Sequence, residues 1–290
     1  MNSVAASVLV GLLVLSAHAQ EPSAKGVNFY SLEREVQIGQ EAASALMRTL
    51  PIVHEPKVDA YLAKLTAELA KYASPQFAYS FTVYEDRKPL GPQWAAMATA
   101  RAFRMPADAF QGQAAEPVAL AGGPILVPLS LLADAPDEAA LAFQLAHAMA
   151  HVALRHVTRM ATRQEIQNIA SATLQAQGPS GPAAAAILST QPLAMQLGLL
   201  TFARGCEREA DTVATGILAE AGYDPGTVVP YLEGQPPADG PRPSRVFSAH
   251  PTAGQRAETV RAKMENLPSR VYAAETGEFD EIKALAASVR

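Results

Sequence analysis

The segment that decides the fold is Leu141-Ala-Phe-Gln-Leu-Ala-His147-Ala148-Met149-Ala150-His151. Its residues predict a helix that carries two histidines four positions apart. Side chains at i and i+4 of a helix project from one face, so both imidazoles can reach the same metal ion. The two histidines are therefore the first candidate ligands of a metal site.

Ala148 stands between these histidines, directly after His147. In the metal-hydrolase form of the pattern, His-Glu-x-x-His, a glutamate at that position is the general base beside the metal. The sequence thus has the histidine pair without the base. The alternative interpretation of His147 and His151 is a pair of helix histidines satisfied by a polar contact.

A metal site of this kind needs a third protein ligand. His156 is a poor candidate, because on a continuous helix of about 100° per residue it points about 140° away from His151. Glu207 and Asp211 are better placed, since they share one face of another predicted helix. One of them can bind the metal while the other accepts a hydrogen bond from a ligand imidazole. Glu209 faces elsewhere on that helix.

Apolar spacing, N-cap residues and terminal Gly or Pro predict a mainly helical chain. The predicted helices cover residues 31–50, 56–72, 134–163, a stretch from 164, 192–221, 253–266 and 279–289. Asp134 is the expected cap of the histidine-bearing helix, with Pro136 in its first turn. Strands are predicted over 77–84, 95–103 and 117–127, the last as two strands joined by a glycine turn. Loops are predicted over 111–116, 178–182 and 234–245.

The composition indicates a globular helical protein. The 290 residues are 49% hydrophobic and 18% charged, with few aromatics, which favours packed helices over a β-sandwich. The formal net charge is −5 and no basic stripe is present, so nothing indicates a nucleic-acid partner. Cys206 is the only cysteine. We interpret it as a small buried packing residue rather than a ligand, and it excludes a disulfide within the chain.

The first residues have the pattern of a secretory signal. A short apolar run over 4–15 is followed by Ala17-His18-Ala19, which predicts a signal over 1–19 and a single mature domain over 20–290. A membrane anchor is the alternative, although the run is shorter than the ~20 residues that span a bilayer. We expect a soluble protein that is periplasmic or otherwise exported, with no transmembrane span after signal removal.

Several segments of the sequence resemble the M48 family of zinc metallopeptidases, which includes periplasmic outer-membrane quality-control proteases. The resemblance covers most of the mature sequence. The matching segments are Asn28-Phe-Tyr-Ser-Leu-Glu-Arg-Glu-Val-Gln-Ile-Gly39, Ala119-Leu-Ala121-Gly122-Gly123-Pro-Ile-Leu-Val127, Arg204-Gly-Cys-Glu207-Arg-Glu-Ala-Asp211, Ala221-Gly222-Tyr223-Asp224-Pro225, and His250-Pro251 with Arg256.

This resemblance implies a fold and a metal site. The fold is mainly α with a small β-sheet, forming a single zincin-like domain. The site holds one zinc ion through His147, His151 and Glu207. Asp211 then hydrogen-bonds a ligand imidazole. His250 corresponds to a histidine that in some members reaches and blocks the metal; its alternative interpretation is a surface loop residue.

The resemblance also places Gly122 and Gly123 in a strand pair along the active-site cleft. There they form either a substrate-pairing edge or only a turn. The preceding residue, Ala121, replaces a proline of the family, which is a mild change.

The severe departure is Ala148 in place of the motif glutamate. General acid–base catalysis contributes roughly 10²–10⁴-fold to a reaction rate. Glu138 lies on the opposite side of the helix from His147, and Glu209 is badly aimed, so the sequence offers no visible substitute base. Normal turnover of peptide substrates is not expected.

Three functions remain open at this point. The first is a zinc metalloendopeptidase homologue whose peptide hydrolysis is lost or strongly reduced. The second is a non-catalytic, chaperone-like protein that holds unfolded or envelope polypeptides. The third is an active metalloendopeptidase, either with an unrecognised base or with an alanine introduced at position 148 to disable it.

Overall fold

The computed structural model describes residues 26–86, 116–176, 182–235, 251–272 and 277–290. The predicted signal over 1–19, the predicted strand over 95–103 and His250 lie outside these ranges, as do most residues of the predicted loops. The described helices are α1 (Leu32–Met47), α2 (Pro56–Ala70), α4 (Leu129–Asp134), α5 (Glu138–Ala153), α6 (His156–Ala176), α7 (Pro182–Glu220), α8 (Val228–Glu233), α10 (Ala253–Met264) and α11 (Glu278–Val289).

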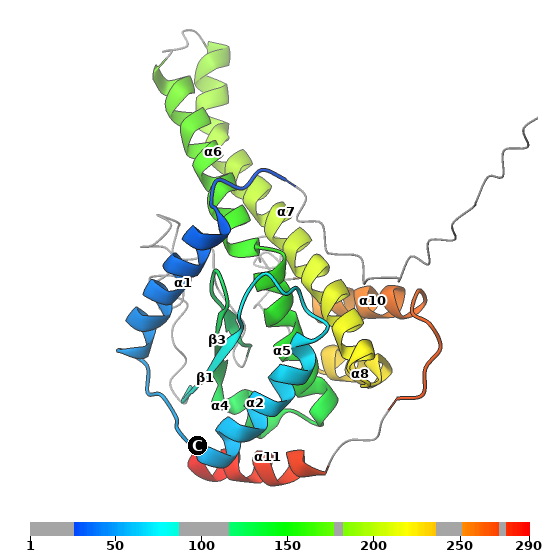
Figure 1. Cartoon of the computed structure of the whole chain (residues 1–290). Coiled ribbons are helices and arrows are strands. Elements are labelled where there is room, and N and C mark those ends of the chain that lie inside the picture. Colours follow the sequence, from blue (N-terminus) through cyan, green and yellow to red (C-terminus); the bar gives the residue numbers. More distant parts are fainter. Residues whose placement is uncertain (1–25, 87–115, 177–181, 236–250, 273–276) are drawn as a thin grey trace, which may run out of the picture.

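One small sheet accompanies these helices, which confirms the predicted fold class of a mainly α protein with a small β-sheet. Its strands are β1 (Ser80–Tyr84), β2 (Val118–Ala119) and β3 (Pro124–Pro128), in the order β1-β3-β2. β1 runs parallel to β3, and β2 runs antiparallel to it. In Figure 1 the sheet lies between α1 on one side and α2 and α5 on the other.

The histidine-bearing helix α5 is the centre of the core. Every residue of α5 except His151 is buried, as expected of a helix that is apolar on all sides. Its N-cap is Asp137, whose side chain accepts a hydrogen bond from the Ala140 N–H. The predicted cap, Asp134, is wrong, because Asp134 ends α4 instead. Proline disfavours the helical conformation of the residue before it, so Ala135 is extended and the helix restarts after Pro136.

The prediction of one continuous helix to residue 163 is also wrong, because the chain bends after Ala153. Leu154 caps α5, Arg155 has a positive φ of 58°, and α6 starts at His156. A non-glycine residue in this conformation costs about 1–3 kcal/mol and persists only where its surroundings hold it. Here Arg155 Nε donates to Glu35 Oε2 of α1 at 2.5 Å, and its Nη2 donates to the Tyr30 carbonyl at 2.5 Å.

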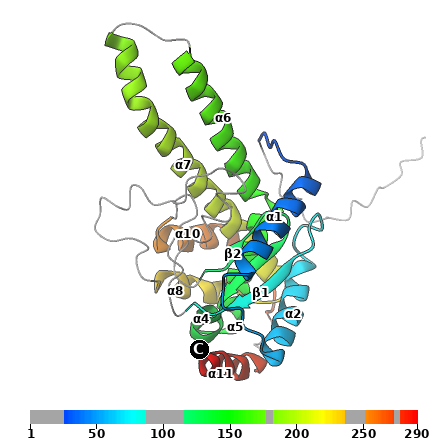
Figure 2. The ribbon, with the colours of Figure 1, turned by 90° about the vertical axis from the view of Figure 1, so that its left-hand side faces the viewer.

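α6 and α7 form a helical hairpin that projects from the rest of the molecule (Figures 1 and 2). α7 starts at Pro182, ten residues earlier than predicted. Its predicted end at Gly222 is confirmed: Gly222 has a φ of 94°, and the following Tyr223 N–H donates to the Leu218 carbonyl, which is a Schellman-type cap. No helix in the described ranges combines the length and apolar character that crossing a membrane requires.

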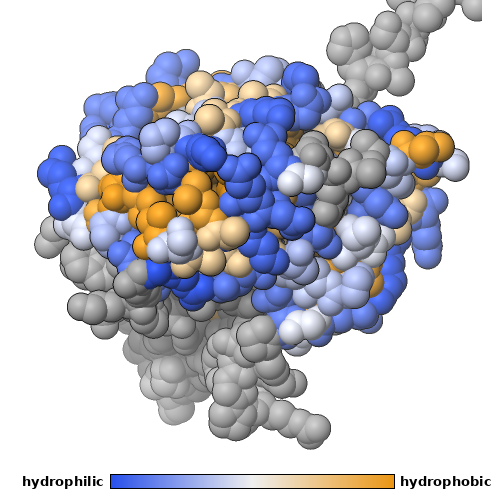
Figure 3. Space-filling view, turned by 90° about the horizontal axis from the view of Figure 1, so that it is seen from below, coloured by the Kyte–Doolittle hydropathy of each residue, from blue (hydrophilic) through white to orange (hydrophobic). Residues whose placement is uncertain are grey.

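The C-terminal helices close the core. α10 packs on α7 and α8, and α11 packs on α4 and α2. Thr252 and Gln255 form a reciprocal capping box at the start of α10. A main apolar cluster unites buried side chains from both halves of the chain, among them Val58, Val127, Leu141, Leu218, Val260 and Phe279. The coloured part of the face seen from below is largely hydrophilic, with a compact apolar patch and smaller apolar spots on it (Figure 3).

At Gly39 the backbone of α1 packs directly against the turn between β2 and β3. A Cβ added at Gly39 would lie 1.6 Å from the Ala121 carbonyl oxygen. The Gly39→Ala substitution must therefore separate two packed backbones, and we expect it to lower the free energy of unfolding by about 1–3 kcal/mol or more. Urea denaturation followed by circular dichroism measures the change.

Gly216 provides the matched control, because it also lies inside a helix. Its added Cβ would meet nothing nearer than Lys263 Cε at 3.6 Å. Alanine is favoured over glycine in a helix by about 1 kcal/mol, so Gly216→Ala is expected to leave stability unchanged or higher. Equal stability of the two variants would show that α1 can move away from the turn at no cost.

Candidate metal centre

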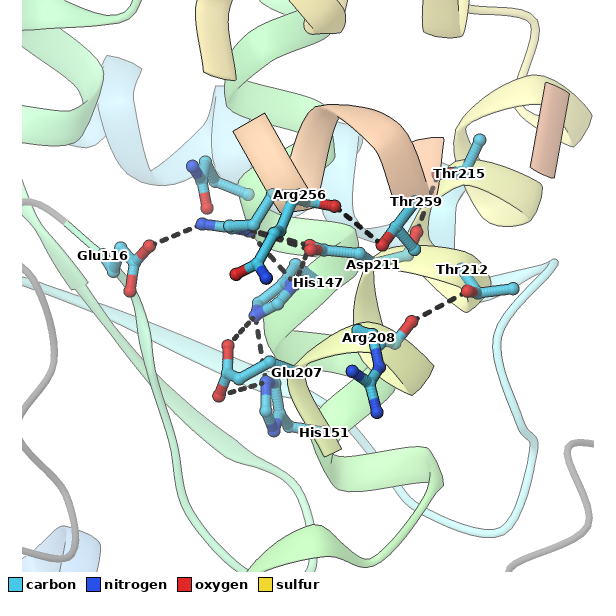
Figure 4. Close-up of polar contacts among 12 residues, drawn as sticks. Glu116, His147, His151, Glu207, Arg208, Asp211, Thr212, Thr215, Arg256 and Thr259 are labelled. Atoms are coloured by element: carbon cyan, nitrogen blue, oxygen red, sulfur yellow. Dashed lines mark hydrogen bonds and ion pairs between the residues drawn. The ribbon is translucent and has the colours of Figure 1, made fainter. Parts of the chain in front are cut away.

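Two packed helices bring three donor side chains together. α5 supplies His147 and His151, α7 supplies Glu207, and one ligand atom from each lies within 4.8 Å of the others. Figure 4 shows the Glu207 carboxylate directed at both imidazoles. The structure thus brings together the three residues that the sequence predicted as ligands, although Glu207 follows His151 by more than fifty positions in the chain.

The separations among these donors suit a tetrahedral zinc ion. His147 Nε2 lies 2.9 Å from His151 Nε2 and 3.4 Å from Glu207 Oε2, and His151 Nε2 lies 3.6 Å from Glu207 Oε1. Zinc with bonds of about 2.0–2.1 Å in tetrahedral geometry separates its ligand atoms by roughly 3.3 Å. Two imidazole nitrogens and one carboxylate are also a known ligand set of catalytic zinc. The residues present therefore fit the ion.

Asp211 fixes the orientation of the first imidazole. Its carboxylate lies 2.8 Å from His147 Nδ1, so the opposite ring nitrogen, Nε2, faces the other donors. Thr215 belongs to the same turn of α7, where its hydroxyl donates to the Asp211 carbonyl at 2.7 Å. Asp211 is fully buried, and the predicted hydrogen bond between it and a candidate ligand histidine is therefore present in the structure.

Arg256 of α10 balances the charge of this buried carboxylate. Its Nη2 donates to Asp211 Oδ1 at 2.8 Å, and its Nε donates to Asp211 Oδ2 at 3.1 Å. This two-pronged pairing is the strongest geometry available to an arginine and a carboxylate. The third guanidinium nitrogen donates to Glu116, which precedes β2, at 2.8 Å. A single buried side chain from the C-terminal region thus joins three separate segments around His147 (Figure 4).

The pKa shifts follow from this arrangement. Burial lowers the pKa of His147, but the charge and hydrogen bond of Asp211 outweigh burial and raise that pKa to about 9. Burial raises the pKa of Asp211, yet the charges of Arg256 and His147 overcome it, so the pKa stays below its usual value. Burial holds the pKa of His151 well below its usual value. The Asp211 carboxylate and burial therefore shift the pKa values of the two imidazoles in opposite directions.

His151 has a different neighbour. His156 Nδ1 lies 3.0 Å from His151 Nδ1, and His156 Nε2 lies 3.2 Å from Glu209 Oε2. Arg159 Nη1 also donates to Glu209 at 2.9 Å. The hydrogen bond from His156 is the main reason why the pKa of Glu209 falls to about 2. The orientation predicted for His156 is wrong, because the bend at Arg155 turns it back toward His151.

Ala148 lies in the apolar core with 1% of its surface exposed. Within the part of the chain that the structure describes, three carboxylates considered as substitutes for the missing glutamate are already engaged. Glu138 accepts a hydrogen bond from the Tyr61 hydroxyl at 2.8 Å, Glu209 binds Arg159, and Asp211 binds Arg256. Each of these contacts fixes its carboxylate in a structural ion pair or hydrogen bond.

The two glycines of the β2–β3 turn have a clear packing role. Gly122 and Gly123 have positive φ values of 70° and 131°. A Cβ at Gly122 would lie 2.4 Å from the Val36 Cα of α1, and a Cβ at Gly123 would lie 2.2 Å from the Ala78 carbonyl oxygen. Both the turn and the close packing explain these residues, while pairing with a substrate stays a prediction. Cys206 is buried, and burial raises the pKa of its thiol to about 12.

Sequence reasoning missed three residues of this region. The sequence indicates Arg256 only through a family resemblance, predicts a loop at Glu116, and predicts that His156 points away from His151. For Arg256 the available signal was its position shortly after His250-Pro251 in a family motif. For Glu116 and His156 no local signal exists, since their contacts depend on how distant segments pack.

Comparison with known proteins shows which family the chain resembles. Residues 93–264 match Peptidase family M48. Similar curated proteins include the beta-barrel assembly-enhancing protease of Yersinia pestis, 28% identical over 157 residues that make up 50% of this chain and 32% of that protein. The protein of the same name from Escherichia coli (strain K12) is 23% identical over 249 residues, 82% of this chain and 45% of its own length.

These relatives are longer proteins, and the chain spans less than half of the length of either one. The family match is independent of that difference, because it extends over more than half of the 290 residues and includes α5, α7 and α10. The chain therefore belongs to peptidase family M48, a family of zinc metallopeptidases.

Proposed function

We propose that this protein is an M48 metalloendopeptidase homologue of the bacterial cell envelope that keeps its zinc site and has lost most or all peptide hydrolysis. The observation that carries the proposal is the coexistence of two features on α5. The donors His147 and His151 keep ligand-like separations with Glu207. Ala148, beside them, has a methyl group where a proton acceptor is required.

The proposed ligands of a single zinc ion are His147, His151 and Glu207. When bound in a site of this kind, zinc polarises the substrate carbonyl and lowers the pKa of coordinated water. Asp211 holds the His147 ring by accepting a hydrogen bond from its Nδ1–H, and Arg256 keeps Asp211 ionised in a buried position. These residues orient the site and balance its charge without moving a proton to or from a substrate.

Loss of hydrolysis is the expected consequence of Ala148. Removing the general base lowers the rate by roughly 10²–10⁴-fold. Glu138 and Glu209 do not compensate, because their carboxylates are held by Tyr61 and by the pair His156 and Arg159. Casein hydrolysis by the natural chain, abolished by a chelator, would contradict this part of the proposal and would favour an unrecognised base.

The cell-envelope location and the substrate class rest on two observations. Residues 1–19 have the pattern of a secretory signal. The relatives include proteins named beta-barrel assembly-enhancing protease. We therefore propose that the chain is exported to the periplasm as a soluble protein and acts on unfolded or envelope polypeptides.

His250 is proposed as a regulatory ligand of the same ion. The support is the position of Arg256, six residues later, whose Nη2 lies 3.4 Å from His147 Nδ1. The segment that follows His250 thus reaches the proposed site. Gly122 and Gly123 are proposed to place the neighbouring strand β2 as an edge for an extended substrate.

A second function, holding polypeptide without cleaving it, is favoured by the same combination of an intact donor set and a missing base. A protein that binds polypeptide without cleaving it does not require a general base at position 148. Capture of unfolded outer-membrane protein that is unaffected by His147→Ala would support a binding role that is independent of zinc.

Glu207→Gln tests the metal site directly. Loss of a residue that only supports a ligand costs roughly 10–100-fold in metal affinity, so we expect loss of the carboxylate ligand itself to cost more than about 100-fold. Chelator competition measures the zinc dissociation constant, and elemental analysis should give one zinc per wild-type chain.

Glu220→Gln is the matched control, because it makes the same change on the same helix. Glu220 forms a partly exposed ion pair with Arg270, and its loss should leave zinc binding unchanged. A wild-type chain without zinc, or equal affinities of both variants, would exclude Glu207 as a ligand.

A further inference from the structure

The bend between α5 and α6 places a second histidine behind His151. His156 is 4% exposed, and its ring lies edge-on to that of His151 with centroids 4.8 Å apart. The contact joins the two Nδ1 atoms at 3.0 Å, so it leaves His151 Nε2 directed at His147 and Glu207. The two proposed histidine ligands are thus supported differently: His147 by a carboxylate directly, and His151 by another imidazole.

Glu209, His156 and His151 form a row of hydrogen-bonded side chains. The carboxylate of Glu209 determines which atom donates and which accepts in each of these hydrogen bonds. An ionised carboxylate accepts hydrogen bonds and donates none, so His156 Nε2, at 3.2 Å from Glu209, carries a proton. A neutral imidazole has one donor and one acceptor nitrogen. His156 Nδ1 is therefore an acceptor, and the His151 Nδ1 that faces it must donate.

The position of the proton on His151 determines which of its nitrogens can bind a metal ion. If His151 carries its proton on Nδ1, its Nε2 has a free lone pair, which is the form that binds a metal ion. We propose that His156, anchored by Glu209, is a positioning residue that fixes this tautomer and ring orientation of His151. This role rests on the proposed zinc site, since it assigns His151 Nε2 as the ligand atom.

The anchoring of the row is built into the fold. Glu209 lies on α7, two positions after the proposed ligand Glu207, and is held in place by Arg159 of α6 at 2.9 Å. The row thus connects α6, α7 and the end of α5 around one imidazole. If His156 only packed against His151, it would not have to be hydrogen-bonded to α7 as well.

Two substitutions at position 156 separate positioning from packing. In His156→Asn the amide oxygen can take the place of Nδ1 and accept the His151 proton, whereas His156→Leu fills the space without an acceptor. We expect His156→Leu to weaken zinc binding by roughly 10–100-fold and His156→Asn to stay close to wild type. A packing role alone would make zinc affinity follow the melting temperature of each variant instead.

A second measurement does not depend on zinc. The ¹⁵N chemical shifts of histidine ring nitrogens distinguish the two neutral tautomers, and we expect His151 to be protonated on Nδ1 in wild type and in His156→Asn. In His156→Leu the two tautomers should mix. Glu209→Gln, at a half-exposed position, is expected to mix them as well, because an amide can donate or accept; it serves if the leucine variant does not fold.

The results separate this inference from the zinc assignment. Absence of zinc from the wild-type protein overturns the ligand set, while the His151 tautomer remains readable. In zinc-free protein, an unchanged His151 tautomer in His156→Leu or Glu209→Gln overturns the positioning role, whether or not the wild-type protein binds zinc. Equal loss of zinc affinity in the asparagine and leucine variants also overturns it.

Discussion

Replacing Ala148 by glutamate is expected to raise chelator-sensitive peptide hydrolysis by roughly 10²–10⁴-fold over the unsubstituted chain. Position 148 directly follows His147 on α5, and in the His-Glu-x-x-His pattern this is where the general base acts beside the metal. The donors are already gathered, with separations of 2.9–3.6 Å among His147, His151 and Glu207. A glutamate at position 148 would therefore add a proton acceptor beside donors that are already gathered.

The measurement is hydrolysis of fluorescent casein by purified protein, with and without a chelator. Ala148→Gln is the control, because glutamine has nearly the same shape as glutamate but is not a base. Since Ala148 is 1% exposed, both variants share the cost of placing a larger side chain in the core. Folded, zinc-loaded Ala148→Glu without added activity would show that the site is inactive for a reason other than the missing base.

Replacing Arg256 by leucine is expected to lower the free energy of unfolding by about 3–5 kcal/mol, because breaking a buried ion pair leaves an uncompensated charge. Arg256 is 4% exposed, and its partner Asp211 is completely buried. The substitution also removes the hydrogen bond to Glu116. Urea denaturation of the zinc-free protein measures the effect without a contribution from metal binding.

Arg261→Leu is the matched control on the same helix. Arg261 pairs with Glu233 at the surface, where both side chains are 48% exposed, and exposed pairs contribute about 0–1 kcal/mol. Adding Asp211→Asn to Arg256→Leu should recover part of the loss, since it removes the stranded charge. Similar destabilisation by the two arginine substitutions would mean that Arg256 contributes no more than a surface residue.

The site was predictable where local periodicity determines it. His147 and His151 share a helix face because they are four residues apart, and the same spacing relates Glu207 to Asp211. That these two faces meet was inferred from a family resemblance, since spacing alone does not dock one helix on another. The helix boundaries marked by Ser31, Gly222 and Thr252 follow from capping preferences that are also local.

The remainder depends on packing between distant segments. Arg155 adopts a positive φ without being glycine, so no residue type signals the bend that returns His156 to His151. The ion pairs of Glu35 with Arg155 and of Glu116 with Arg256 join residues more than one hundred positions apart. Such contacts leave no periodic pattern in the sequence.

Arg256 follows Asp211 by 45 residues. Their ion pair therefore cannot form until well after Asp211 has been synthesised. At translation rates of about 5–20 residues per second, the arginine leaves the ribosome roughly 2–9 s after the aspartate. During that interval a nascent chain contains His147, His151 and Glu207 but lacks the arginine that pairs with Asp211 beside them. The pairing of α5 with α7 should therefore be completed only after α10 has been made, and a ribosome-stalled fragment ending before α10 should stay sensitive to protease at this junction.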